Sequence, residues 1–286
     1  FNFMNFKLYN LVMDISIVIL NYKSKGDTLN CIKSIKEADW KTHPDPPFEK
    51  ERGIKYEIIV VDNGSEDSIG QILAWQYPEI IFIQNDVNIG MGAGNNTGIR
   101  RASGDYVVTM NPDTIAFPDT FKKLYSYMQS NAKVGVVGPQ QINPDQTIQE
   151  SCYRWPGLMV PFYRRTFLGK LRFAQKYLHH YLMKDFDHLS EKKVDWLLGS
   201  FLFCRTEALQ GVGLFDERYF MYFEDTDLCR RFWEKGWQVA YYPEAKIIHN
   251  HARQSAQDPW YKFFINQMAR HHIISWLKYL NKWGLS

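Results

Sequence analysis

The residues most able to do chemistry follow an unbroken run of aromatic and methionine side chains at positions 219–223. Glu224, Asp225 and Asp227 come directly after this run. Apolar surroundings penalise an ionised carboxylate, so such a group usually has a metal ion, a hydrogen-bond donor or a helix N-terminus beside it. The stretch is therefore the first place to look for a general base, the group that takes a proton from a reacting hydroxyl.

The same stretch also has a purely structural explanation. Residues 225–236 predict a helix, because Leu228, Phe232 and Trp233 share one face and Gly236 is typical of a helix C-terminus. Acidic residues in a first helical turn are favoured by capping and by the helix dipole. Taken alone, this stretch fits a helix start and a catalytic site equally well.

Composition narrows the classes of protein to consider. The chain has 286 residues, of which 45% are hydrophobic and 16% aromatic, enough for one large α/β domain or a core domain with an appendage. A net charge of +3 gives no overall basic footprint for nucleic acid. No stretch is long and apolar enough to span a bilayer. Four cysteines without paired spacing indicate buried thiols in a reducing cytoplasm, not a zinc site or disulfides: Cys31, Cys152, Cys204 and Cys229.

Short β-branched runs alternate with helical patterns through the first part of the chain. Such alternation predicts an α/β fold with a mostly parallel central sheet flanked by helices. A Pro-rich, charged stretch at 43–53 predicts a loop. The predicted strands are 14–21, 56–62, 80–84, 106–110, 134–137, 197–204 and 238–242, and the predicted helices are 25–38, 69–77 and 94–101.

Polar residues follow three of these predicted strands. Asn21 ends the first, Asp62 and Asn63 end the second, and Asn111-Pro-Asp113 follows the fourth. Open α/β sheets bind ligands at the carboxyl ends of their strands. Ordinary turn chemistry would also explain each cluster singly. Their convergence on one sheet edge favours a ligand site.

A glycine-rich stretch at 88–98 (NIGMGAGNNTG) invites comparison with dinucleotide-binding loops. It does not follow a strand in the dinucleotide manner, and no acidic strand end follows at the right distance, which argues against an NAD-dependent oxidoreductase. The glycines do allow close backbone approach to a ligand. Asn95 and Asn96 can cap the next helix or contact that ligand.

Asp113 and His249 are candidate ligands of a divalent cation. Mg²⁺ and Mn²⁺ typically use one or two carboxylates plus substrate oxygens, as in the bridging of a diphosphate. A lone histidine is usually structural, but the His249-Asn-His251 stretch follows a strand-like run, where a metal ligand is an equal alternative.

Together these residues resemble the inverting family 2 glycosyltransferases with the GT-A (Rossmann-like) fold, and within them the rhamnosyltransferase-like branch. The resemblance covers residues 15–255. Each motif is modest, but their order and spacing are specific. The motifs are 60–65 (VVDNGS), 88–99, 110–114 (MNPDT), 196–200 (WLLGS), 213–217 (GLFDE), 222–228 (YFEDTDL), 242–245 (YPEA) and His249.

The resemblance implies a role for each matching residue. Asp225 would be the catalytic base with Glu224 beside it, and Asp62 would hydrogen-bond a pyrimidine base. Asp113 would bind Mg²⁺ or Mn²⁺ together with His249; Asn111 replaces the first Asp of the usual Asp-x-Asp motif, which puts a strict metal requirement in doubt. The nucleotide-sugar set is Asn21, Asp62, Asn63, Asn88, Gly90, Asn95, Asn96, Asn111 and Asp113, and the acceptor set is Trp196, Gly199 and Ser200.

The implied activity is transfer of L-rhamnose from dTDP-rhamnose by a metal-assisted, inverting single displacement. The acceptor would be a saccharide, free or linked to polyprenyl diphosphate, in the synthesis of a bacterial surface glycan from the cytoplasmic side. A transferase using a UDP-hexose remains an alternative within the same class. A catalytically idle nucleotide- or glycan-binding protein is a third possibility, suggested by Asn111.

The resemblance also implies a domain organisation. Residues 1–13 would be an N-terminal extension, 14–255 the GT-A domain, and 256–286 a C-terminal helical extension. Within the domain, 14–115 would bind the nucleotide sugar and 116–255 the acceptor. Segments 158–193 and 260–283 mix basic and aromatic residues. Such helices either attach peripherally to the inner face of an anionic cell membrane or pack on the core, and both alternatives stay open.

Overall fold

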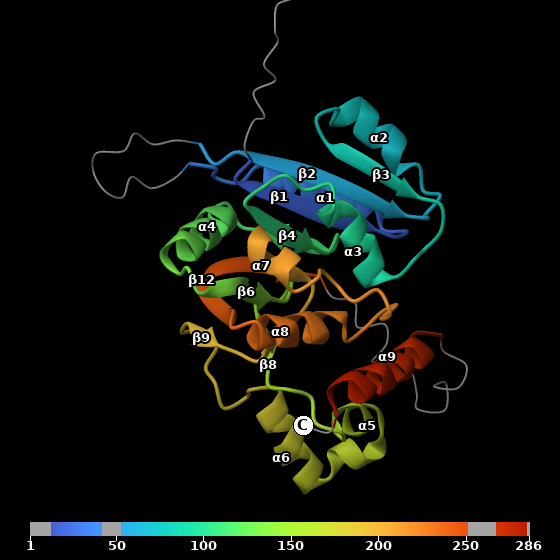
Figure 1. Cartoon of the computed structure of the whole chain (residues 1–286), viewed down its shortest axis with the longest axis vertical. Coiled ribbons are helices and arrows are strands. Elements are labelled where there is room, and N and C mark those ends of the chain that lie inside the picture. Colours follow the sequence, from blue (N-terminus) through green and yellow to red (C-terminus); the bar gives the residue numbers. More distant parts are fainter. Residues whose placement is uncertain (1–12, 42–52, 251–266, 285–286) are drawn as a thin grey trace, which may run out of the picture.

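The computed structural model describes residues 13–41, 53–250 and 267–284 (Figure 1). The described part contains one large sheet with the strand order β3-β2-β1-β4-β11-β6-β12-β5, and a small β10-β8 sheet. The strands are β1 (Ile15–Asn21), β2 (Tyr56–Asn63), β3 (Ile81–Asn85), β4 (Tyr106–Met110), β5 (Thr114–Ala116), β6 (Val134–Ile142), β7 (Ile148–Gln149), β8 (Cys152–Tyr153), β9 (Lys192–Lys193), β10 (Trp196–Leu197), β11 (Phe201–Arg205) and β12 (Gln238–His249).

Helices cover both faces of this sheet, as the sequence predicts. The helices of the described residues are α1 (Lys25–Lys36), α2 (Ile69–Gln76), α3 (Met91–Ile99), α4 (Thr120–Ser130), α5 (Val160–Arg165), α6 (Arg172–Tyr181), α7 (Thr206–Gly211), α8 (Glu224–Glu234) and α9 (Gln267–Trp283), with a 3-10 turn η1 (Phe167–Lys170). Of these, α5, α6 and α9 lie away from the faces of the sheet (Figure 1). Of the predicted loop at 43–53, only residue 53 is among the described residues. His251 and the predicted boundary at 255 lie outside them.

Alternation along the central strands divides the core between the two faces. Ile15, Ile17 and Ile19 of β1 pack with α1, α2 and α4, whereas Val18 and Leu20 pack with α3, α7 and α8. This is the period-two pattern of a strand buried on both sides. Strands β1 to β4 run parallel, and β11 enters antiparallel between β4 and β6, so the sheet is mostly parallel.

Three predicted strands differ clearly in their limits. The predicted 134–137 strand continues to Ile142 as β6, and the other two differences bear on the site. The predicted 197–204 strand is interrupted: β10 ends at Leu197, and Leu198, Gly199 and Ser200 turn before β11 begins. The predicted 238–242 strand continues to His249, with a register shift between Tyr242 and Lys246. The extension carries His249 to the edge where β12 pairs with β5.

The four cysteines are buried and unpaired, which confirms the absence of a disulfide among them. Within the described residues, no helix has the length and apolar character needed to cross a membrane.

Candidate active site

The predicted base-binding residues meet at the carboxyl end of the sheet. Register places Asn21 of β1 opposite Asp62 of β2, and Asp62 opposite Gln84 of β3. Asn21 Nδ2 donates to Asp62 Oδ1 at 2.6 Å, and Gln84 Nε2 donates to Asp62 Oδ2 at 2.6 Å. Burial raises the pKa of Asp62, but hydrogen bonds from Ser65, Gln84 and Asn21 outweigh it and hold the pKa below its usual value. Asp62 is therefore an ionised acceptor at the sheet edge.

Asn63 organises the glycine-rich loop beside this row. Its Nδ2 donates to Asn88 Oδ1 at 2.9 Å and to the Gly90 carbonyl at 3.2 Å. Gly90 has φ +96°, and a Cβ there would lie 2.5 Å from the carbonyl oxygen of Phe220, so only glycine fits. The Met91 amide donates to that same carbonyl at 2.7 Å. The loop predicted to hold the donor thus contacts the aromatic run that precedes the acidic pair.

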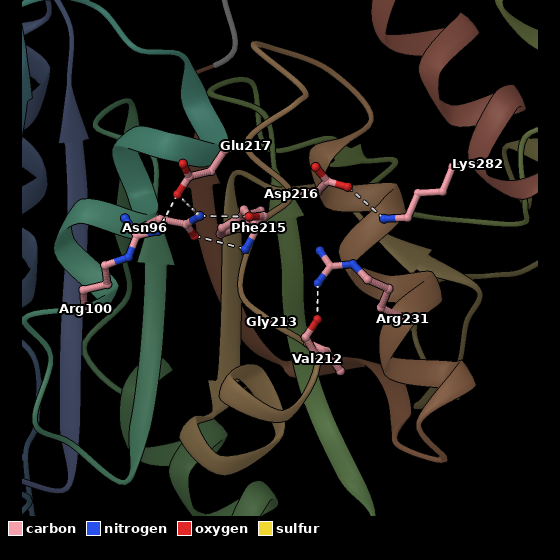
Figure 2. Close-up of a pocket in the computed structure, with 9 residues that line it drawn as sticks. All are labelled: Asn96, Arg100, Val212, Gly213, Phe215, Asp216, Glu217, Arg231 and Lys282. Carbon is pink, nitrogen blue, oxygen red and sulfur yellow. Dashed lines mark hydrogen bonds and ion pairs between the residues drawn. The ribbon is translucent and has the colours of Figure 1, made fainter.

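Asn95 and Asn96 lie on α3, and their amides bond to the chain itself. Asn95 Nδ2 donates to the Met91 carbonyl at 3.1 Å. Asn96 Nδ2 donates to the Phe215 carbonyl and to Glu217 Oε1, while its Oδ1 accepts from the Phe215 amide (Figure 2). Asn96 therefore holds the loop after α7 against α3. A contact between either asparagine and a donor remains a prediction.

Asn96 also lines a polar hollow of about 380 Å³. Ion pairs cross its rim, Arg100 with Glu217 and Lys282 with Asp216 at 2.9 Å (Figure 2). None of the other predicted donor, metal or catalytic residues lines it. These ion pairs connect α3 and α9 to the loop that precedes α8. The hollow therefore lies where these three parts of the chain meet, beside the candidate site.

Asp113 and His249 are brought together by the pairing of β5 with β12. His249 lies opposite Thr114, and the Asn250 amide donates to the Asp113 carbonyl at 2.8 Å. His249 Nε2 faces Asp113 Oδ1 at 3.5 Å. Asp113 Oδ1 is buried and has no hydrogen-bond partner within the described structure. Two side chains that lie nearly half the chain apart in the sequence thus converge on one point.

The chemistry of this pair fits a divalent cation. His249 Nδ1 lies 2.8 Å from Gln149 Oε1; because an amide oxygen only accepts, Nδ1 carries a hydrogen in this contact, which leaves Nε2 on the side of Asp113. The carboxylate oxygen suits Mn²⁺ or Mg²⁺, whereas the imidazole nitrogen suits a transition-metal ion better than Mg²⁺. The described residues contain no group of three or more His, Cys, Asp or Glu arranged for a metal. Substrate oxygens would therefore have to complete the shell.

Asp225 lies in the first turn of α8, buried and held by backbone donors. Gly199 N–H donates to its Oδ2 at 2.9 Å and Thr226 N–H to its Oδ1 at 2.7 Å. Burial raises the pKa of Asp225, and these two amides oppose the rise. The helix start thus positions the carboxylate, so the structural and the catalytic explanations of this stretch are compatible.

Glu224 is buried beside Asp225 but differs from it in hydrogen bonding and protonation. Its Oε2 is buried with no hydrogen-bond partner in the described structure. Burial, and then the negative charge of Asp225, raise the pKa of Glu224 to about 8. Near neutral pH, Glu224 is therefore protonated beside a carboxylate whose amide donors favour ionisation.

The turn that delivers this pair is strained. Tyr222 and Phe223 both have φ +68°, the left-handed region that side chains with a Cβ avoid. Such strain persists only where the surroundings hold it, and it is concentrated at functional sites. Here α9 holds it: Ser275 Oγ donates to the Met221 carbonyl at 2.8 Å, and Tyr279 packs with Phe223 in a buried cluster.

The three predicted acceptor residues lie in the Gly199-Ser200 turn and in β10, the strand just before it. Gly199 contacts Asp225 directly. Ser200 Oγ donates to Gln141 Oε1 at 2.8 Å, and the Ser200 carbonyl accepts from the Asn111 amide at 2.8 Å, so the turn also joins the Asn111-Pro-Asp113 stretch. Trp196 is buried against Tyr153, with its Nε1 donating to the Arg154 carbonyl at 2.9 Å. Acceptor contact by these residues remains a prediction.

Sequence reasoning missed two residues of this network. Gln84, which donates to Asp62, ends a predicted strand and could have been found by the same strand-end rule that found Asp62. Gln149, which fixes the ring of His249, lies in the two-residue strand β7 and has no signal in the sequence.

Comparison with known proteins identifies the family. The model of glycosyl transferase family 2 matches residues 16–189, and that of glycosyl transferase family group 2 matches 106–284. The chain belongs to glycosyl transferase family 2. It is 30% identical over 226 residues to the N-acetylglucosaminyl-diphospho-decaprenol L-rhamnosyltransferase of Mycobacterium tuberculosis, covering 75% of this chain and 71% of that protein. It is 28% identical over 236 residues to rhamnosyltransferase WbbL of Escherichia coli, covering 79% and 82%.

Solved structures confirm the GT-A fold of this family 2 glycosyltransferase. The mannosyltransferase PcManGT from Pyrobaculum calidifontis, in complex with GDP-Man and Mn²⁺, has a TM-score of 0.58 at 17% identity and covers 95% of this chain. S. aureus TarS 1-349 in complex with UDP-GlcNAc has a TM-score of 0.55 at 15% identity and covers 86%. This chain spans 65% and 61% of those two chains, less than two thirds of each.

Proposed function

We propose that the protein transfers L-rhamnose from dTDP-rhamnose to a lipid-linked saccharide by an inverting single displacement. One observation carries the proposal. Asp225, a buried carboxylate held by two backbone amides, is linked through the Gly199-Ser200 turn to Asn111 and so to the Asp113–His249 pair. The residues proposed as the proton acceptor and as the diphosphate-binding pair are therefore connected at the carboxyl end of the sheet, which supports the proposal. The rhamnosyltransferase relatives support the choice of sugar, and the decaprenol-linked substrate in one relative's name supports the acceptor.

Each group has one task in this mechanism. Asp62 accepts a hydrogen bond from the pyrimidine base, and Asp113 with His249 would hold Mg²⁺ or Mn²⁺. When bound, the cation would neutralise the charge that builds up on the diphosphate. The acceptor oxygen forms its bond to the anomeric carbon as the bond from that carbon to the diphosphate breaks. Asp225 takes the hydroxyl proton, and the electron pair of the broken bond leaves with the nucleoside diphosphate.

A UDP-sugar is the alternative donor. Uracil and thymine present the same hydrogen-bonding edge, so Asp62 would accept from either. The TarS complexes with UDP and UDP-GlcNAc show that a protein of this fold binds a UDP-sugar, at 16% and 15% identity to this chain. Product formation with a panel of dTDP- and UDP-sugars separates the two, and NMR of the product's anomeric carbon tests inversion.

Replacement of the base gives the sharpest test of the mechanism. Asp225→Asn keeps the size of the side chain but removes the proton acceptor, so we expect transfer to fall by roughly 10²–10⁴-fold while dTDP binding stays within a few-fold. Turnover and calorimetric dTDP binding are the two measurements. Unchanged turnover would exclude Asp225 as the base, and failure of the unaltered protein to bind any nucleoside diphosphate would overturn the proposed function as a whole.

A further inference from the structure

The segment from α5 to α6 forms one end of the molecule, opposite α2 and β3 (Figure 1). Its inner side is well packed: Val160, Ala174 and Tyr181 are buried against the rest of the protein. Its outer side is also apolar, with Phe167 at 74% and Phe173 at 61% exposure. Leu158, Phe162, Leu171 and Tyr177 are exposed in the same segment. We call these six residues the apolar end.

A helical hairpin that is already packed on one side has no need of a second apolar side. Scattered single hydrophobic residues are normal on a surface, but several in one short segment mark a surface that another body covers. Phe173 and Tyr177 contact the Tyr163 ring within the hairpin, yet among the described residues all six side chains of the apolar end remain exposed.

The charge of the same segment indicates what kind of binding partner would cover it. Residues 151–184 contain seven Lys and Arg and no Asp or Glu. Lys170, Arg172 and Lys176 are exposed among the residues of the apolar end. Exposed aromatic and leucine side chains interspersed with cations, without acids, match the interface of an anionic bilayer, where rings enter the headgroup region and cations meet lipid phosphates.

A second copy of the chain fits this surface less well. A two-fold dimer through the apolar end would place the same surface against itself, so cations would face cations without any acid between them. Self-association is therefore an outcome that the experiment below must distinguish.

We propose that the α5–η1–α6 hairpin docks the enzyme on the surface of an anionic phospholipid bilayer. The hairpin contacts β10, the strand that leads into the Gly199-Ser200 turn. Tyr181, the last residue of α6, contacts the Trp196 ring, and Trp196 precedes the Gly199-Ser200 turn that holds Asp225. Docking through this hairpin would thus bring the Gly199-Ser200 turn and Asp225 toward a membrane-embedded acceptor. That last step rests on the proposed function, whereas the docking itself does not.

Vesicle binding by the full chain tests the proposal. Sedimentation with vesicles of phosphatidylcholine, and of phosphatidylcholine mixed with phosphatidylglycerol, should show binding to the anionic vesicles alone. Each cation near such a surface contributes on the order of 1 kcal/mol. The triple variant Lys170→Glu, Arg172→Glu and Lys176→Glu should therefore bind at least roughly a hundredfold more weakly. The double variant Phe167→Ala and Phe173→Ala should weaken binding at unchanged charge.

Matched variants elsewhere on the surface provide the controls. Lys33→Glu, Lys133→Glu and Lys235→Glu together change the net charge equally, and Trp75→Ala removes an aromatic ring that is 80% exposed on α2. Both controls should bind anionic vesicles as the unaltered protein does. Circular dichroism and thermal unfolding, measured on every variant, report folding independently of lipid and of the donor, and calorimetric dTDP binding separately tests the proposed function.

Three results would overturn the docking proposal. They are equal binding to neutral and anionic vesicles, equal losses in the hairpin and control variants, and a concentration-dependent dimer that the hairpin substitutions dissociate while no vesicle binds. Competition of vesicle binding by a short single-stranded oligonucleotide, with tighter binding to the oligonucleotide than to lipid, would reassign the surface to nucleic acid. Vesicle binding without dTDP binding would instead leave docking standing and remove the proposed function.

Discussion

Gly199 supplies one of the two backbone amides that position Asp225. A Cβ at Gly199 would lie 3.1 Å from Asp225 Cβ and 3.2 Å from its Oδ2, closer than ordinary van der Waals contact. Gly199→Ala keeps the N–H donor but displaces the carboxylate by a few tenths of an ångström. Because misplacement of a catalytic group is costly, we expect kcat to fall roughly ten- to a hundredfold with little change in dTDP affinity.

Gly211→Ala is the matched control, because nothing lies within 4 Å of a Cβ built there. Steady-state kinetics of the two variants decide the question. If both variants behave alike, the Gly199–Asp225 contact does not position the base.

Glu224 makes stability depend on pH in a predictable direction. Its folded-state pKa is raised to about 8, against a usual value of 4.5, so the folded protein binds more protons than the unfolded chain between these values. Its contribution to stability is therefore complete below about pH 4.5 and is lost as pH rises through about 8. We expect Glu224→Gln, which cannot ionise, to unfold at a midpoint that falls less between pH 6 and 9. Thermal unfolding across that range is the measurement, and parallel pH curves for the two proteins would contradict it.

At the scale of elements, α9 packs against the strained 222–223 turn and the first turn of α8 and supports both. Asp227 is fully buried in α8, where it accepts from Trp283 Nε1 at 2.8 Å and pairs with Lys282 at 2.7 Å. Losing partners of a buried carboxylate is destabilising, so Lys282→Met with Trp283→Ala should lower the free energy of unfolding by about 2–4 kcal/mol.

This support from α9 should also affect the reaction. Because α9 supports the strained 222–223 turn, kcat should fall more than dTDP affinity in that double variant. Asn281→Ala, on the exposed side of the same helix, is the control. Denaturant unfolding and steady-state kinetics together test this support, which would be refuted by a double variant with the stability and kcat of the control.

The elements that could be predicted from sequence are those whose local pattern agrees with their environment. The strands β1, β2 and β4 are continuous β-branched runs buried on both faces, and their predicted limits agree within one residue. Helix α3 begins at Met91, before the predicted start at Gly94, because tertiary packing overrides the low helix propensity of glycine. A Cβ at Gly94 would collide with Leu20, and one at Gly98 with Val18.

The candidate site shows the same division. Strand ends predict Asn21, Asp62 and Asp113, since parallel strands end at a common edge. The Asp113–His249 contact depends on β12 continuing past Pro243 through a register shift, which period-two alternation cannot reveal. Contacts with Gln149 and Gly199 depend on a two-residue strand and a turn, and such short elements carry no pattern of their own.

At the scale of the whole molecule, one sheet joins the proposed base and diphosphate sites. Asp62 lies on β2, whereas Asp113 directly precedes β5 and His249 ends β12, on the other side of β1, β4, β11 and β6. A ligand that binds only the folded state stabilises it by about 2.7 kcal/mol at a hundred times its Kd. For a chain of this size, dTDP with Mg²⁺ should therefore raise Tm by roughly 5–10 °C.

Two substitutions should separate the contribution of the nucleobase site from that of the metal site to this stabilisation by dTDP and Mg²⁺. Asp113→Ala should abolish the difference that Mg²⁺ makes to dTDP stabilisation but keep a metal-free effect of dTDP. Asp62→Ala should lower dTDP stabilisation with and without metal alike, and leave that difference in place. Because the two carboxylates share no partner, their effects should add in the double variant. Thermal unfolding is the measurement. If Mg²⁺ still raises the Tm of the Asp113→Ala variant with dTDP, the cation binds elsewhere. If Asp62→Ala loses only the Mg²⁺-dependent part, then Asp62 and not Asp113 belongs to the metal site.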